Sequence, residues 1–219
     1  MTATYTAVIF DMDGVLADTE PIYHHAMQLV LNPLGKQISA EQQRHMMGSS
    51  IEDTWRYLAQ TFDLPGPLDA LIAAYDLELV RQLALVHDTL PGVRELIDAL
   101  RQRSVPVAVA SSSLPAWIDA LLGGLDLAHA FDAAVSARHA AHPKPAPDVY
   151  LLAAERLGVA PERCIAIEDT PTGLASANAA GMFTIQVRAA STAFPPLPNA
   201  RLVLDTLHHF DLSLLTHGP

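Results

Sequence analysis

The stretch YTAVIFDMDGVLADTE, residues 5–20, places two aspartates directly after an apolar run. Residues 5–10 have the pattern of a buried strand that stops at Asp11, and Asp13 follows one residue later. Two carboxylates at the edge of a hydrophobic strand repel each other and lose hydration, so they need a compensating positive charge. A turn at Gly14 can direct both side chains toward one ligand. A divalent cation would supply the charge, because hard oxygen ligands suit Mg²⁺.

The same design recurs along the rest of the chain. Further apolar stretches that end abruptly in polar residues lie at 106–113, 131–137, 163–169, 182–187 and 201–205. Near-continuous apolar strands are typical of a parallel sheet that is covered on both faces. Helical patterns alternate with these strands at 92–103, 115–125, 147–158 and 171–181. We therefore predict an α/β fold with a doubly wound, Rossmann-like parallel-sheet core.

Residues 17–87 do not follow the alternation of strand and helix. They contain four helical patterns and no convincing strand, at 22–35, 39–48, 51–62 and 67–85. The strand–helix rhythm resumes after Pro91-Gly92. We therefore expect an α/β catalytic core formed by 1–16 and 88–219, with 17–87 inserted as a helical cap that determines substrate specificity.

The charge balance restricts the class of partner. The chain carries 24 acidic and 13 basic residues, for a net charge of −11. This argues against nucleic acid or an anionic membrane as the main partner, because both reward basic stripes. No apolar run approaches the roughly 20 residues that span a bilayer, and the N-terminus lacks a signal-peptide pattern. The single cysteine, Cys164, lies in an apolar stretch and is expected to be buried, so we expect a cytoplasmic protein.

Polar residues at the predicted strand ends form a second pattern. They are Asp11 with Asp13, Ser111 in the serine run 111–113, residues 168–169 and, in the proline-rich stretch HPKPAPD, Lys144. Taken singly, a serine run is usually a helix N-cap, and PKP is usually a rigid turn. Together they fall where ligands bind in such sheets, beyond the carboxyl ends of the strands. The pattern therefore indicates a phosphate clamp around a metal, with one carboxylate free to attack.

Four segments resemble, in order, the signature motifs of the haloacid dehalogenase superfamily. They are DMDGVLADTE (11–20), VAVASSS (107–113), PKPAPDVY (143–150) and AIEDTPTGLASANAAGM (166–182). The resemblance spans essentially the whole chain. The insert after the first motif resembles the cap of the subgroup that contains β-phosphoglucomutase and many small sugar-phosphate phosphatases.

This resemblance implies a role for each matching residue. Asp11 corresponds to the nucleophile that becomes an aspartyl phosphate, and Asp13 to the general acid and base. Ser111 corresponds to the hydroxyl that binds the transferring phosphoryl group, and Lys144 to the lysine that neutralises it. Such a mechanism divides one difficult displacement into two easier ones.

The resemblance also implies a Mg²⁺ site and substrate contacts. Asp169, with Glu168, is expected to complete the metal site beside the Asp11 carboxylate and the Asp13 main-chain carbonyl. For the substrate, a small phosphorylated metabolite, we expect contacts from Ser112, Gly48, Ser49 and His24. The protein is expected to be a monomer, with a dimer as the alternative.

Close relatives with other chemistry fit less well. True haloacid dehalogenases lack an acid at the position of Asp13. Phosphonate-cleaving members use a cap lysine, whereas the only lysine in the cap here is Lys36, and His45 stands where that lysine is expected. We therefore expect neither activity.

Three readings of the function stay open. The first is a Mg²⁺-dependent phosphatase acting on a sugar or polyol phosphate, or on phosphoglycolate. The second is a β-phosphoglucomutase-type mutase, which the sequence disfavours because residues 50–53 (SIED) replace the arginine that grips a second phosphate. Tyr23 also stands where mutases have a histidine. The distant third is a phosphoaspartate receiver-like switch, a class that has no helical cap.

Overall fold

The carboxyl ends of six parallel strands form the edge at which the predicted polar residues meet. A computed structural model describes residues 5–46, 49–190 and 194–215 of the chain. Its sheet has the order β3-β2-β1-β4-β5-β6, and every neighbouring pair is parallel. The strands are β1 (Ala7–Phe10), β2 (Val107–Ser111), β3 (Ala133–Ser136), β4 (Cys164–Glu168), β5 (Phe183–Val187) and β6 (Leu202–Leu204). The prediction of a doubly wound parallel sheet is confirmed, and the order reverses at β1, where such sheets bind ligands.

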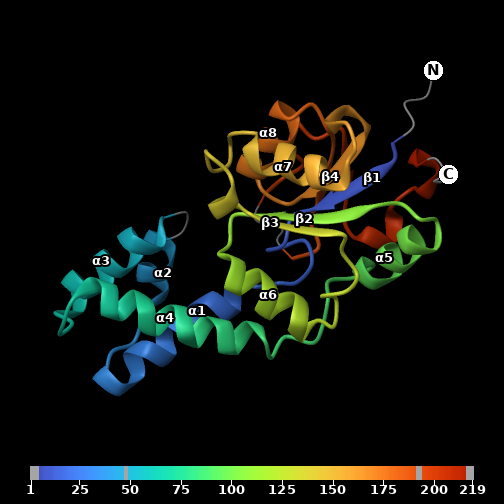
Figure 1. Ribbon diagram of the computed structural model, residues 1–219. Helices are drawn as coiled ribbons and strands as arrows, with labels where there is room; N and C mark the ends of the chain where they lie inside the picture. The colour runs from blue at the N-terminus through green and yellow to red at the C-terminus, as the bar shows by residue number, and fades with distance from the viewer. Residues whose placement is uncertain (1–4, 47–48, 191–193, 216–219) are drawn as a thin grey trace.

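Helices cover both faces of this sheet (Figure 1). One face packs against α5 (Val93–Gln102) and α6 (Pro115–Gly124), and the other against α7 (Asp148–Leu157) and α8 (Pro171–Ala179). Strand β1 shows why its apolar run is continuous. Val8 and Phe10 belong to one hydrophobic cluster, Ala7 and Ile9 belong to the other, and all four are fully buried. Alternate side chains therefore serve the two faces.

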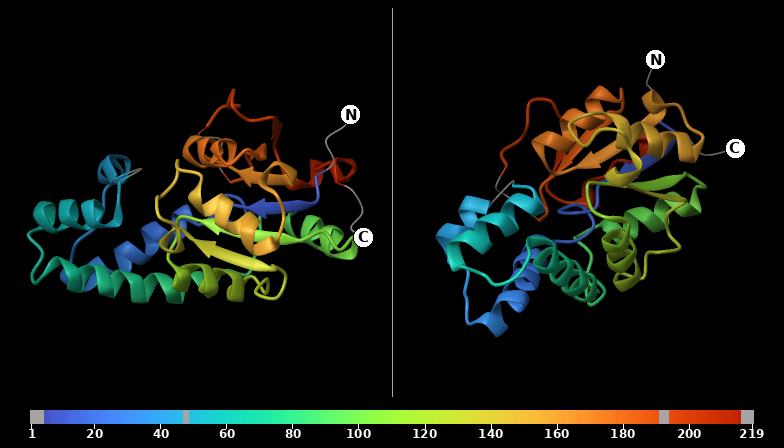
Figure 2. Two further views of the ribbon diagram at one scale, coloured as in Figure 1. Left: turned by 45° about the horizontal axis from the view of Figure 1, so that its top comes forward. Right: turned by 60° about the vertical axis from the view of Figure 1, so that its left-hand side comes forward.

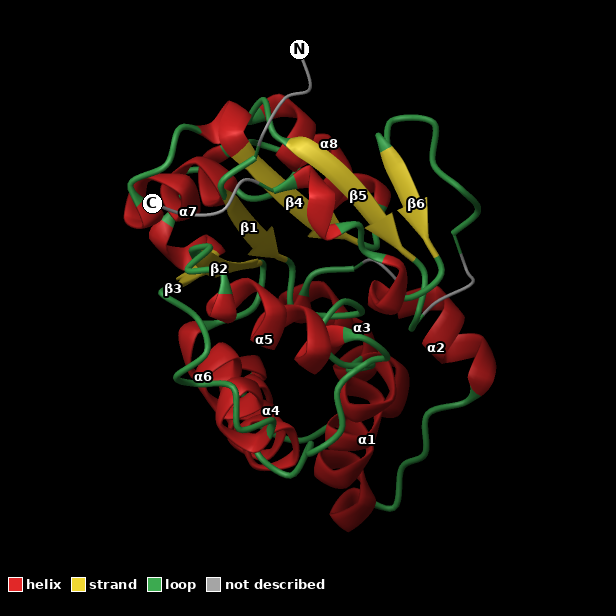
Figure 3. Cartoon of the chain, turned by 90° about the vertical axis from the view of Figure 1, so that its right-hand side faces the viewer, coloured by secondary structure: helices red, strands yellow, loops and turns green. Residues whose placement is uncertain are grey.

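Four helices form a separate layer beside the sheet, in the part of the chain where a helical cap is expected. They are α1 (Glu20–Leu31), α2 (Ala40–Met46), α3 (Ile51–Phe62) and α4 (Leu68–Leu83). Figure 2 shows them gathered to one side of the sheet. In Figure 3 the arrowheads of the strands point toward this layer. The carboxyl ends of the strands therefore face the inserted helices. Short 3₁₀ helices lie at Asn32–Leu34, Ala137–His139, Pro161–Arg163, Leu207–His209 and Leu212–Leu214.

An aromatic cluster joins the inserted helices to the sheet domain. The ring of Trp117 on α6 lies 6.1 Å from that of Tyr75 on α4 and 5.8 Å from that of Tyr23 on α1. Tyr75 also contacts Trp55 of α3, at 5.6 Å between ring centres. Trp55 and Tyr75 are fully buried. These rings belong to or pack against the hydrophobic cluster that also contains Phe10, so one apolar core extends from the sheet into the insert.

Two smaller expectations concern burial and membrane spans. Cys164 begins β4 and is fully buried, as the apolar stretch around it predicted. Within the described ranges, no helix combines the length and apolar character needed to cross a bilayer.

Gly92, where the chain enters α5, provides a test of backbone packing. Its φ is +88°, and a Cβ there would lie 2.1 Å from the backbone nitrogen of His208 and 2.4 Å from the carbonyl carbon of Leu207. Gly66 has the same φ of +88° but has nothing within 4 Å of the equivalent Cβ position. The two glycines therefore separate backbone strain from steric exclusion.

We expect Gly92→Ala to destabilise the protein more than Gly66→Ala does. The positive φ costs either alanine about 1–2 kcal/mol, and the clash with backbone atoms adds about 1–3 kcal/mol at position 92 alone. Urea unfolding followed by circular dichroism measures both free energies of unfolding. Equal losses in the two variants would contradict the close packing described at Gly92.

Candidate active site

Lys144 connects the ends of three neighbouring strands. Its ammonium group donates to Asp11 Oδ1 and to Glu168 Oε1, each at 2.6 Å, and to the carbonyl oxygen of Ala110 at 3.1 Å. The register of the sheet explains this meeting, because Phe10 is paired with the residue before Ala110 and with the residue before Glu168. The residues that follow on β1, β2 and β4 therefore emerge at one level. The Lys144 side chain is only 5% exposed.

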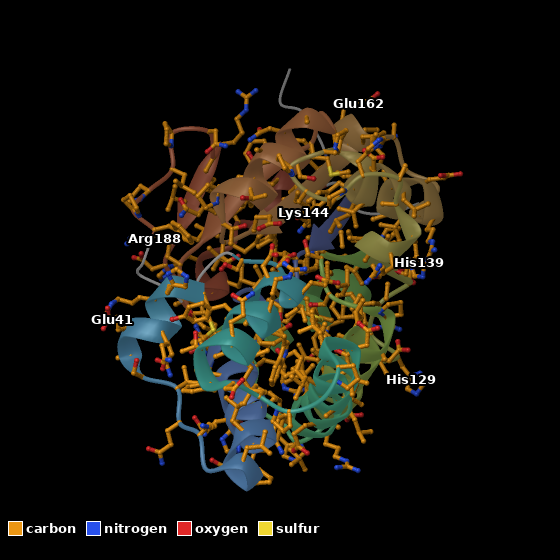
Figure 4. The ribbon with its side chains drawn as sticks, turned by 90° about the vertical axis from the view of Figure 1, so that its left-hand side faces the viewer. Glu41, His129, His139, Lys144, Glu162 and Arg188 are labelled. Atoms are coloured by element: carbon orange, nitrogen blue, oxygen red, sulfur yellow. The ribbon has the colours of Figure 1, made fainter. Side chains whose placement is uncertain are left out.

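The side-chain view supports this central position. Figure 4 shows Lys144 in the middle of the molecule, where the sheet domain meets the inserted helices. In the same view Glu41, His129 and Glu162 lie near the outline. Lys144 is thus an interior charge, whereas those three residues belong to the surface.

Glu168 is held from both sides of its carboxylate. Tyr150 of α7 donates its hydroxyl to Oε1 at 2.8 Å. The other oxygen, Oε2, accepts the backbone N–H of Asp169 and the hydroxyl of Thr170, each at 3.2 Å. A Cβ at Gly173 would come within 1.8 Å of Oε1, so no larger residue fits there without displacing the carboxylate. Glu168 is therefore fixed in place as well as hydrogen-bonded.

Burial shifts the protonation of this cluster. Burial, with the neighbouring Glu168 charge as the next cause, raises the pKa of Asp11 well above its usual range, and Lys144 only partly opposes the rise. For Lys144, burial alone would lower the pKa, but the Asp11 and Glu168 charges outweigh it and raise the pKa above the usual lysine value. Burial raises the pKa of Asp169 to about 7, with Glu168 and Asp13 adding to the effect. The single ammonium group of Lys144 does not neutralise all the carboxylates around it.

The acidic cluster fits a divalent cation. Carboxylate oxygens of Asp11, Glu168 and Asp169 lie within 4.8 Å of one another. Asp169 Oδ1 is buried and has no hydrogen-bond partner among the described residues, which makes it a candidate metal ligand. An all-oxygen donor set without cysteine or histidine suits a hard cation. Lys144 and Tyr150 already hydrogen-bond to Glu168. The carboxylates of Asp11 and Asp169 are therefore freer to bind an ion.

Asp13 occupies a different environment from Asp11. Its Oδ1 accepts the hydroxyls of Thr19 at 2.6 Å and of Tyr23 at 2.8 Å. Its Oδ2 accepts the hydroxyl of Ser113 at 2.8 Å. Three neutral donors, from the loop after β1, from α1 and from the loop after β2, therefore orient this carboxylate. Two acids from one strand end are thus held by different chemistry.

The two predicted serines of the second motif lie in different environments. Ser111 is fully buried, and its Oγ accepts the backbone N–H of Ser113 at 3.0 Å. Ser112 is exposed and lines a cavity of about 640 Å³ between the inserted helices and the sheet domain. Contact of either serine with a phosphoryl group stays a prediction.

The predicted substrate contacts of the cap are more scattered. Gly48 lies outside the described residues. Ser49 is exposed, and its backbone N–H donates to the Met46 carbonyl at 3.0 Å. His24 lines a separate hollow of about 540 Å³, with its Nε2 3.8 Å from a Glu20 oxygen. The structure does not bring Ser49 or His24 into contact with Asp11, and their roles stay predictions.

Sequence reasoning missed five residues whose hydroxyl groups hold the acids in place. They are Thr19, Tyr23 and Ser113 around Asp13, and Tyr150 and Thr170 beside Glu168. All but Tyr23 lie inside the quoted motifs. The available signal was a hydroxyl-bearing residue within each motif, but this signal does not show which way the backbone presents its side chains.

Comparison with known proteins places this arrangement in a family. The family model described as haloacid dehalogenase-like hydrolase matches residues 8–187. The chain belongs to this family, which confirms the resemblance of its motifs and identifies it as a hydrolase. Membership in a family of enzymes argues against the receiver-like switch.

Individual relatives cover nearly the whole chain. Fructose-1-phosphate phosphatase YqaB of Escherichia coli (strain K12) is 40% identical over 187 residues, which are 84% of this chain and 97% of that protein. Hexitol phosphatase B of the same organism is 35% identical over 217 residues, covering 96% and 94% respectively. Among solved structures, a putative β-phosphoglucomutase from Thermotoga maritima aligns with a TM-score of 0.79 at 30% identity, covering 90% and 93% of the two chains.

The raised pKa of Asp169 predicts a dependence of stability on pH. An unfolded aspartate has a pKa of about 4, whereas burial raises the folded value to about 7. The folded state therefore binds this proton more tightly, and the contribution of Asp169 to the free energy of unfolding falls as pH rises from about 4 to about 7. Without divalent cations, we expect Asp169→Asn to gain thermal stability relative to wild type as pH rises through this window.

Thermal unfolding in a chelator at several pH values measures this difference. Asp98→Asn, at an exposed position of α5, is the matched control and should differ from wild type equally at each pH. A pH-independent difference for Asp169→Asn would contradict the assigned pKa.

Proposed function

We propose that this protein is a Mg²⁺-dependent phosphatase that hydrolyses a small sugar or polyol phosphate through an aspartyl-phosphate intermediate. The observation that carries the proposal is the pair of acids at the end of β1. Asp11 contacts the buried Lys144 ammonium at 2.6 Å, whereas neutral hydroxyls hold Asp13. Two carboxylates in different environments suit two different roles.

Asp11 is the proposed nucleophile. Lys144 engages its Oδ1, and Oδ2 accepts no hydrogen bond from the described residues, so we assign Oδ2 to the attack on phosphorus. The new Oδ2–P bond forms as the bond from phosphorus to the ester oxygen breaks. The Lys144 charge is placed to neutralise the phosphoryl oxygens, as phosphoryl transfer requires.

Asp13 is the proposed general acid and base. In its protonated form it gives a proton to the departing ester oxygen, and it then takes a proton from the water that attacks phosphorus. This second attack breaks the bond to Asp11 and releases phosphate. The hydroxyls of Thr19, Tyr23 and Ser113 keep the Asp13 carboxyl group aimed at the reacting oxygen.

Asp11 and Asp169 would hold Mg²⁺, with the Asp13 carbonyl as the further protein ligand expected from the motif and Glu168 at its side. The fit rests on the clustered oxygens and on the unpaired Asp169 Oδ1. The ion supplies positive charge that lets the phosphate approach the Asp11 carboxylate.

The names of the relatives support a sugar or polyol phosphate as the substrate, and phosphoglycolate is the smaller alternative. The mutase alternative draws support from the structural neighbour called a putative β-phosphoglucomutase. Against it, Tyr23 stands at the position of the mutase histidine and is bonded to Asp13. Two acids of the insert also lie where a mutase has the arginine that grips its second phosphate. Glu52 lines the large cavity, and Asp53 is hydrogen-bonded by Ser50 and Arg56. A monomer in the cytoplasm remains our prediction.

The test measures phosphate release with Mg²⁺ from fructose 1-phosphate, a hexitol phosphate and phosphoglycolate. A parallel assay follows glucose 6-phosphate formed from β-glucose 1-phosphate with a trace of glucose 1,6-bisphosphate. We expect phosphate release that stops in EDTA, because the buried carboxylates then repel the substrate phosphate. Asp11→Asn should abolish it, and Asp98→Asn should retain it. Glucose 6-phosphate without free phosphate would identify a mutase instead, and wild-type rates from Asp11→Asn would refute the mechanism.

Tyr23→Phe tests how Asp13 is held. The change removes one hydrogen bond to a carboxylate, and such bonds are worth roughly 1.5–3 kcal/mol. We expect kcat for phosphate release to fall about tenfold or more while KM changes little. Tyr57→Phe is the matched control on α3, since the Tyr57 ring packs at a tilt against His45 and its hydroxyl forms no hydrogen bond with a described group. Equal kcat values in both variants would show that Tyr23 does not position Asp13.

A further inference from the structure

The cavity of about 640 Å³ adjoins the proposed reaction centre. Its walls come from α3, α4 and α6 and from two loops of the sheet domain. Ser112 in the first loop directly precedes Ser113, which bonds Asp13. Pro143 in the second directly precedes Lys144. A substrate whose phosphate lies at Asp11 would therefore extend its organic part into this cavity.

Three charged side chains face the cavity, and none of them forms a side-chain hydrogen bond or ion pair with another described residue. Asp76 of α4 has a buried Oδ1 with no hydrogen-bond partner among the described residues. Burial raises the pKa of Asp76, and the nearby Arg138 only partly opposes the rise. The guanidinium of Arg138, from the 3₁₀ helix after β3, forms no hydrogen bond or ion pair with any described group. Glu52 of α3 is the third.

Asp76 and Arg138 therefore share one cavity without bonding each other. A buried acceptor without a donor is unfavourable, so a ligand that donates to Asp76 would stabilise the site. A hydroxyl group can both donate to a carboxylate and accept from a guanidinium. A chain of adjacent hydroxyls can thus satisfy both residues at once, while the Trp117 ring offers an apolar wall.

The charge of the cavity selects against anionic ligands. Two acids, Glu52 and Asp76, face it against one base, Arg138. A second phosphate or a carboxylate on the substrate would approach with unfavourable net charge. An uncharged polyhydroxylated arm avoids this repulsion.

We propose that Asp76 and Arg138 form the specificity site of this enzyme, binding the hydroxyl groups of an uncharged polyol arm on a monophosphorylated substrate. The inference rests on the proposed phosphatase function and assigns the residues that select an uncharged polyol arm within its substrate class. Selection of the substrate is thus assigned to one residue of α4 and one of the 3₁₀ helix after β3.

The experiment compares a hexitol phosphate with phenyl phosphate, which has no hydroxyl arm, in Mg²⁺. The readout is the ratio of the two kcat/KM values. We expect Asp76→Ala and Arg138→Ala each to lower this ratio about tenfold or more, mainly through KM for the hexitol phosphate. Asp69→Ala removes an exposed acid from the first turn of the same helix, and its ratio should stay within about twofold of wild type.

The outcomes separate the inference from the function. Unchanged ratios in both cavity variants, with phosphate still released from both substrates, would overturn the inference and leave the phosphatase standing. A wild-type preference for phosphoglycolate or a bisphosphate over the hexitol phosphate would overturn it too. Failure of wild type to release phosphate from any ester would overturn the function and the inference together. If Asp76→Ala does not fold, the exposed Arg138→Ala carries the same comparison.

Discussion

The contact of one buried ammonium group with three strand ends is the interaction on which the rest of the site depends. Lys144 neutralises part of the charge on Asp11 and Glu168, which otherwise repel each other on adjacent strands. Removing one partner of a buried pair typically costs about 3–5 kcal/mol, because the other charge is then left uncompensated. The clamp is nevertheless incomplete. Asp169 Oδ1 has no hydrogen-bond partner among the described residues, and the proposed cation would make up this shortfall of positive charge.

The two acids of the first motif owe their difference to what surrounds them. Asp11 is buried and lies among charged groups, whereas neutral hydroxyl donors hold the carboxylate of Asp13. One of those donors, Tyr23, belongs to α1, the first of the inserted helices. The insert therefore does more than cover the cavity, because it also supplies a group that orients Asp13, the proposed acid and base.

The fold and the central cluster were predictable because both depend on local patterns. Apolar runs that stop at polar residues predicted the parallel strands and the edge at which Asp11, Lys144 and Asp169 meet. Other features depend on tertiary packing, which periodicity does not encode. Tyr23 reaches Asp13 only because the packing of α1 against Trp117 sets the rotation of that helix. The proximity of Asp76 and Arg138 likewise depends on how α4 sits beside the 3₁₀ helix after β3, and neither residue lies in a motif that the sequence analysis singled out.

The aromatic joint between α4 and α6 bears on how such proteins diversify. Trp117 belongs to the sheet domain by sequence, yet its ring packs on Tyr75 and Tyr23 of the insert within one apolar core. The insert is therefore not a detachable module. A chimera that exchanges only the segment between β1 and α5 would set a foreign surface against Trp117 and lose this packing. An evolutionary or laboratory exchange of substrate range that keeps the fold must carry the matching face of α6 with it.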